Sequence, residues 1–170
     1  MQRVNGGVRV LVFLSLSLAS VLAQGQRPLF DDAPRTPSKS AVVFLYPEQI
    51  TIPAGKPTAV ALHFRVAPGL HINSHTPSQE ELIPTTLKLP PGSGVRLDGV
   101  IYPPGTDFTL SLDPSTKLNV YTGEFVLQAR FVATPGDHLV EATLRYQACD
   151  NTACMPPKTI TAAIDIVGKK

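Results

Sequence analysis

The chain has 170 residues, of which 43% are hydrophobic and 16% are charged. This length suits one domain with a hydrophobic core large enough to fold without the disulfides that mini-proteins need. The formal net charge is +2, and without Arg3 and Arg9 the remaining 13 Lys and Arg balance 13 Asp and Glu. A neutral domain has no basic field for nucleic acid or anionic lipid, so neither is an expected partner.

The first 23 residues have the pattern of a secretory signal peptide. Arg3 and Arg9 precede an apolar run of 13 residues from Val10 to Leu22, which only serines interrupt. Such a run is too short for a membrane span, and small residues up to Ala23 form a cleavage site. We therefore expect export and cleavage after Ala23. Residues 24–40 mix prolines, charges and serines without periodicity, which predicts a flexible lead-in before a domain at 41–168.

Beyond residue 41 the hydrophobic pattern has a period of two, as in half-buried strands. Four clear strands are predicted at 58–66, 123–133, 138–149 and 158–167, and shorter ones at 41–46 and 85–89. Their inward faces alternate with polar residues and comprise Val60, Leu62, Phe64, Val66, Phe125, Leu127, Ala129, Phe131, Val140, Ala142, Leu144, Tyr146, Ala148, Ile160, Ala162, Ile164 and Ile166. Frequent prolines argue against long helices. Seven to nine short strands separated by turn signals predict an all-β fold, an antiparallel β-sandwich of immunoglobulin-like type.

The two cysteines lie five positions apart in the stretch "YQACDNTACMPPK", at 146–158. The strands on either side predict a hairpin that carries Cys149 and Cys154 at its tip. A disulfide there would close a ring of about six residues and stabilise the fold by roughly 2 kcal/mol. Spacing alone leaves three possibilities open: a structural disulfide, a redox-active pair and a metal site.

The metal alternative depends on "HINSH", which places His71 and His75 four residues apart. Cysteine and histidine side chains bind zinc or copper, but the sequence contains no CxxC pair and no histidine cluster. The simpler interpretation is that both histidines are exposed in a loop. We therefore expect no metal and no other cofactor.

The cysteine motif resembles the signature of the N-terminal periplasmic domain of DsbD, the thiol:disulfide interchange protein. Further similarities occur in order along residues 41–167, in "PGLHINSHTP", "GVIYPPG" and "LNVYTGEFVLQARF". The resemblance implies an immunoglobulin-like sandwich and a periplasmic component of a protein-disulfide reductase, with a link to cytochrome c assembly. It implies a membrane thiol-disulfide transporter as electron donor and oxidised thioredoxin-fold proteins as acceptors. Family members continue into a membrane domain and a thioredoxin-like domain, so for a chain ending at Lys170 we expect the donor to be a separate polypeptide.

The resemblance also assigns roles to residues. Cys154 is the attacking cysteine that bonds to the partner, and Cys149 resolves the mixed disulfide. Asp150 next to Cys149 disfavours a thiolate there, in agreement with that assignment. The segment from Asp98 to Pro104 is expected to cover the cysteine hairpin and so shield it. The candidates for shielding or tuning the pair are His71, Asn73, Asp98, Ile101, Tyr102, Tyr146 and Pro156, although Tyr146 also fits a core position and Pro156 a docking lip.

Overall fold

The computed structural model describes residues 40–45, 49–92, 94–110 and 113–170. The expected signal peptide and all of the expected lead-in except Ser40 lie outside the described residues. The described part is all-β, and it holds no helix of the length and apolarity that a membrane span requires. Its strands are β1 (Val42–Leu45), β2 (Gln49–Pro53), β3 (Thr58–Val66), β4 (His71–Asn73), β5 (Thr86–Lys88), β6 (Val95–Ile101), β7 (Thr106–Leu110), β8 (Asp113–Tyr121), β9 (Glu124–Ala133), β10 (Gly136–Tyr146), β11 (Ala148–Cys149) and β12 (Lys158–Lys169).

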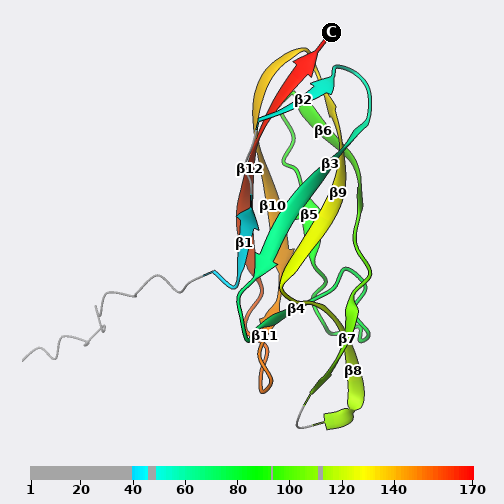
Figure 1. Ribbon diagram of the computed structural model, residues 1–170, viewed down its shortest axis with the longest axis vertical. Coiled ribbons are helices and arrows are strands. Elements are labelled where there is room, and N and C mark those ends of the chain that lie inside the picture. Colours follow the sequence, from blue (N-terminus) through cyan, green and yellow to red (C-terminus); the bar gives the residue numbers. More distant parts are fainter. Residues whose placement is uncertain (1–39, 46–48, 93, 111–112) are drawn as a thin grey trace, which may run out of the picture. The chain divides into compact units, whose positions relative to one another are not determined.

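These strands form three four-stranded sheets, which can be followed in Figure 1. The first has the order β1-β3-β9-β6, the second β2-β12-β10-β5 and the third β11-β4-β8-β7. Pairing is antiparallel except between β2 and β12, which run parallel. The first two sheets supply most of the buried side chains and form the sandwich, whereas the third holds the cysteine hairpin. The expected immunoglobulin-like β-sandwich is confirmed.

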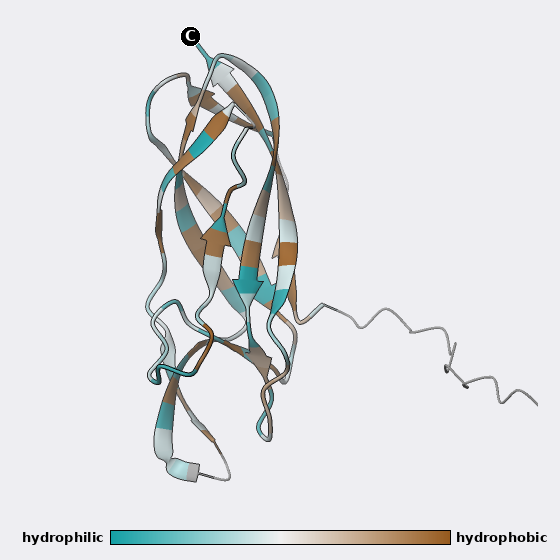
Figure 2. Cartoon of the chain, turned by 180° about the vertical axis from the view of Figure 1, so that it is seen from behind, coloured by the Kyte–Doolittle hydropathy of each residue, from teal (hydrophilic) through white to brown (hydrophobic). Residues whose placement is uncertain are grey.

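The core follows the period-two pattern of the sequence, and Figure 2 shows brown and teal alternating along the strands. Phe64 is fully buried at the centre, with its ring 5.2 Å from that of Phe44 and 5.4 Å from that of Phe125. Alternate side chains of β9 and β10 point into the same cluster, among them Leu127 and Leu144. All the predicted inward residues are buried except Ile160, which is partly buried against the core.

Two expectations need correction. The described residues contain twelve strands rather than seven to nine, in part because β4 and β11 of the third sheet are only three and two residues long. The segment from Asp98 to Ile101, expected in a covering loop, belongs to β6 and pairs with β9. A register shift between Leu97 and Gly99 interrupts its alternation, which is why the strand was not apparent from the sequence.

Candidate functional site

The two cysteines form a disulfide beyond the paired ends of β10 and β12. Tyr146 and Lys158 are the last partners of that ladder, and the cysteines lie in the connection between them, as expected. The sulfur atoms are 2.05 Å apart and the Cα atoms 3.9 Å apart. The two cysteines differ in exposure, since Cys149 is only 1% exposed whereas Cys154 faces solvent. Only Cys154 therefore offers an incoming thiol a direct approach.

The disulfide joins two residues whose backbones are also paired by hydrogen bonds, and these bonds do not involve sulfur. Cys149 and Cys154 are antiparallel bridge partners, flanked by two backbone hydrogen bonds. Met155 N–H donates to the carbonyl of Ala148 at 2.8 Å, and Asp150 N–H donates to that of Ala153 at 3.0 Å. These bonds make the cysteines a non-hydrogen-bonded pair, the arrangement in which opposite Cα atoms come closest. The local backbone therefore holds the sulfurs together.

Asp150 closes the turn between the cysteines. One of its carboxylate oxygens accepts hydrogen bonds from the Thr152 amide, the Thr152 hydroxyl and the Ala153 amide, at 2.7, 2.7 and 2.9 Å. These donors, chiefly those of Thr152, lower the pKa of Asp150 to about 2. A fixed negative charge thus stands next to Cys149, and both this charge and burial oppose a thiolate on Cys149.

The third sheet has two faces with different roles. On one face, Ile72, Ala148 and Tyr121 join the sandwich core. Strand alternation places Cys149 and His71 on the opposite face, where they are direct partners across β11 and β4. The β7–β8 hairpin continues this sheet, as Figure 1 shows. Cys149 is consequently buried on the face opposite Ala148, with His71 as its neighbour across the strands.

His71 is the buried side chain next to Cys149. Its ring lies 4.1 Å from the ring of Phe108, measured between centroids, and the residue is 1% exposed. Its buried Nε2 atom has no hydrogen-bond partner within the described part of the chain. Burial lowers the pKa of His71, partly offset by the negative charge of Asp150. The interpretation of His71 as an exposed loop histidine is therefore wrong, because β4 packs it between Cys149 and Phe108.

Gln147 connects the cysteine hairpin to the segment after β4. Its amide nitrogen donates to the carbonyl of Met155 at 3.3 Å. Its carbonyl oxygen accepts from the Asn73 side chain at 3.1 Å and from the Ile83 amide at 3.3 Å. Asn73 is fully buried and also donates to the carbonyl of Ile83. Asn73 thus supports the hairpin through Gln147.

Three of the candidates for shielding are Asp98, Ile101 and Tyr102, on β6 and just after it. The Asp98 carboxylate pairs with Arg96 and Arg130, and the hydrogen bond from Arg96 is the main cause of its lowered pKa. Ile101 is 65% exposed. The Tyr102 ring stacks on His75 at 3.7 Å and its hydroxyl accepts from the Leu87 amide. Shielding by Ile101 and Tyr102 stays a prediction. The aromatic ring that packs on His71, the cross-strand partner of Cys149, is that of Phe108.

The remaining candidates divide between the core and the surface. Tyr146 is fully buried, with its hydroxyl 3.2 Å from that of Ser40, as a core strand residue should be. Pro156 is exposed beside Met155, which packs partly against the core. Phe108 and Gln147 are parts of the site that the sequence candidates did not include. The polar Gln147 immediately before "AC" was the only sequence signal for either residue.

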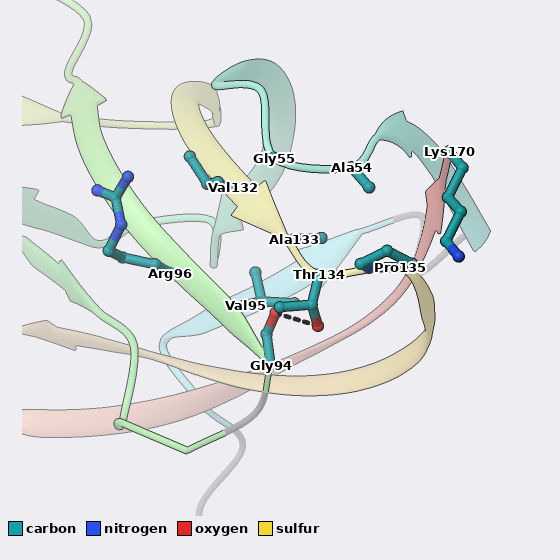
Figure 3. A pocket seen from close by; sticks show the side chains of 10 residues that line it. All are labelled: Ala54, Gly55, Gly94, Val95, Arg96, Val132, Ala133, Thr134, Pro135 and Lys170. Carbon is teal, nitrogen blue, oxygen red and sulfur yellow. Dashed lines mark hydrogen bonds between the residues drawn. The ribbon is translucent and has the colours of Figure 1, made fainter.

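Two hollows differ in their relation to the disulfide. One, of ≈ 520 Å³, adjoins the cysteine hairpin, and its lining includes His71, Phe108 and Asn151 together with the ion pair of Arg65 and Glu124. The other, of ≈ 620 Å³, is drawn in Figure 3 and lies near Lys170, where β9 ends and β6 begins. Neither lining contains a cysteine, and only the first hollow is lined by a residue of the cysteine hairpin, Asn151. The first hollow is therefore the one that adjoins the site.

Among the described residues, no three His, Cys, Asp or Glu side chains lie together so that they could hold a metal ion. His75 bonds through Nδ1 to the carbonyl of Thr85 and stacks on Tyr102. His71 instead packs on Phe108, so the two histidines of "HINSH" engage different partners.

An immunoglobulin-like sandwich with one exposed and one buried sulfur in a hairpin disulfide fits the class of thiol–disulfide exchange modules. The chain belongs to the family described as thiol:disulfide interchange protein DsbD, N-terminal, which matches residues 41–166. Family membership implies interaction with thioredoxin-like partners and with membrane transporter domains.

Comparison with solved structures gave two matches that bear on this chain. The N-terminal periplasmic domain of ScsB from Proteus mirabilis matches with a TM-score of 0.50 and 13% identity, over 73% of this chain and 44% of that one. The reduced N-terminal domain of DsbD from Neisseria meningitidis matches with a TM-score of 0.45 and 20% identity, over 68% of this chain and 82% of that one. The chain therefore spans less than half of the ScsB chain. Comparison with curated protein sequences gave no match.

Proposed function

We propose that this protein is a periplasmic electron carrier. It takes electrons from a membrane thiol-disulfide transporter and passes them to oxidised thioredoxin-fold proteins through Cys149 and Cys154. In this proposal residues 1–23 are a cleaved signal peptide, 24–40 a lead-in and 41–168 the working domain. The periplasmic location is supported by the family and by the N-terminal sequence pattern.

The observation that carries the proposal is the difference in exposure between the two sulfurs. Thiol–disulfide exchange needs one accessible sulfur to meet the partner and a second to resolve the mixed disulfide. Cys154 is exposed and leads into the exposed Pro156, whereas Cys149 is 1% exposed beside an ionised Asp150. Cys154 is therefore assigned to the partner and Cys149 to resolution.

Trapping experiments test this assignment. The reduced Cys149→Ser variant should form a stable mixed disulfide with an oxidised thioredoxin-fold protein, because no thiol remains to resolve it. The matched Cys154→Ser variant should form little, because its remaining thiol is buried. Non-reducing gels separate the adducts. An adduct from Cys154→Ser alone would reverse the roles.

A structural disulfide is the main rival interpretation. Structural bridges in secreted proteins typically have reduction potentials below about −300 mV, whereas exchange partners lie higher. Equilibration of the wild-type protein in glutathione buffers measures this potential. A bond that stays oxidised throughout, together with no adduct from either variant, would refute the carrier function.

A further inference from the structure

A buried histidine stands directly across the sheet from the buried cysteine. His71 and Cys149 are register partners on β4 and β11, and each is 1% exposed. Side chains of opposite residues share a face, with Cβ atoms typically about 4.5–5.5 Å apart. The Nε2 atom of His71 is buried and has no hydrogen-bond partner among the described residues. An unpartnered buried ring nitrogen is costly, so its retention here calls for a reason.

The proposed function gives Cys149 a task that its surroundings oppose. To resolve a mixed disulfide it must attack as a thiolate. Burial and the neighbouring carboxylate of Asp150 both favour the neutral thiol instead. A nearby base that takes the proton during attack removes this obstacle.

His71 is in the right form to be that base. Burial lowers its pKa, so the ring is neutral at pH 7 and can accept a proton. Asp150 is the charged group that acts on His71 from the cysteine hairpin, and it stabilises the imidazolium once formed. Among the described residues, two further charged side chains line the hollow next to His71, Arg65 and Glu124, and they form an ion pair with each other. On β7, Asp107 next to Phe108 pairs with Lys117.

We propose that Nε2 of His71 accepts the proton of the Cys149 thiol as this thiol resolves the mixed disulfide on Cys154, an inference that rests on the proposed function. Beforehand, the Cys154 thiolate attacks the acceptor's disulfide and one acceptor sulfur leaves as a thiolate. The Cys149 sulfur then bonds to the Cys154 sulfur and its proton passes to His71. The second acceptor sulfur leaves as a thiolate. The acceptor gains two electrons, and the domain returns to its disulfide. The imidazolium then releases this proton to water, because the lowered pKa of His71 favours the neutral ring.

A small disulfide probe isolates the resolving step. The reduced wild-type domain is mixed with one equivalent of 5,5′-dithiobis(2-nitrobenzoate), and the coloured thionitrobenzoate is followed by stopped flow. The first release reports attack by Cys154 and the second reports displacement by Cys149. With His71 as base, the rate of the second release is level above the pKa of His71 across about pH 7 to 9. An unassisted thiol gives a rate that rises about tenfold per pH unit up to its own pKa.

The variant His71→Gln keeps a polar side chain of similar size but accepts no proton at neutral pH. Its second release should be about 10²-fold slower at pH 7 and should approach the wild-type rate at high pH, while the first release is unchanged. His75→Gln, four residues away, is the matched control and should behave as wild type.

Three results would overturn the inference: a wild-type rate that climbs steadily across this range, an unchanged second release in His71→Gln, or equal slowing of both releases at every pH. The wild-type profile decides the question even if the variant does not fold. Absence of any second release from the wild-type protein would remove the carrier function, and this inference with it.

Discussion

Reduction of the Cys149–Cys154 bond should leave the sandwich folded. The bond closes a ring of six residues at a hairpin tip, for which chain entropy gives about 2.2 kcal/mol. Domains are typically stable by about 5–15 kcal/mol, so most of the stability should remain. The two backbone hydrogen bonds that flank the cysteines, and the turn closed by Asp150, do not involve sulfur and should persist.

The expected size of the effect can be stated as a melting temperature. Pro37 to Lys170 is roughly 130 residues, with an unfolding entropy of about 0.27 kcal/mol/K, so 2.2 kcal/mol corresponds to a decrease of about 8 °C. Far-UV circular dichroism melts with and without reductant measure the decrease, and Cys154→Ala is the control that lacks the ring without enlarging a core cavity. Loss of the folded spectrum at room temperature, or a decrease in melting temperature several times larger, would refute the reasoning and favour the interpretation that the disulfide is structural.

Two further predictions concern the surroundings of the cysteines. Phe108→Ala should speed alkylation of the reduced Cys149 thiol, because the Phe108 ring packs on His71, the neighbour of Cys149; equal rates in this variant and the wild type would contradict that role. Tyr102→Ala, measured in the same way, tests the sequence-based prediction that Tyr102 covers the hairpin. The Asp150 carboxyl should titrate at about 2 by NMR, so the stability it gives is complete above about pH 4 and is lost as the pH falls through 2. A midpoint near 3.8, or an unchanged acid limb in Asp150→Asn, would show that the turn does not hold the carboxylate.

The sandwich could be predicted from the sequence because its long strands have one buried face. The alternation in β3, β9, β10 and β12 comes from burial against one core, and no detail of the loops affects it. The third sheet escaped prediction because β4 and β11 are two or three residues long and β4 is buried on both faces. In β6 the bulge at Asp98 interrupts the alternation, so the sequence pattern indicates a loop where the structure has a strand.

The site was predictable only where the chemistry lies close in sequence. Cys149, Asp150 and Cys154 belong to one turn, and their proximity follows from the hairpin. His71 and Phe108 reach this turn through the pairing of β11, β4, β8 and β7, which is set by tertiary structure. The sequence pattern indicates His71 as a candidate for tuning the cysteine pair, but it predicts neither the burial of His71 nor the part played by Phe108.

The backbone pairing of Cys149 with Cys154 affects how this domain would distinguish its electron donor from its acceptor. Because the hydrogen bonds on either side of the cysteines are independent of the S–S bond, the cysteine hairpin should keep one main-chain shape when oxidised and when reduced. A donor and an acceptor would therefore meet nearly the same hairpin. Release after electron transfer would then not depend on a change in the shape of this hairpin. It must come from the sulfurs themselves, through the loss of the intermolecular bond and the change from two thiols to none.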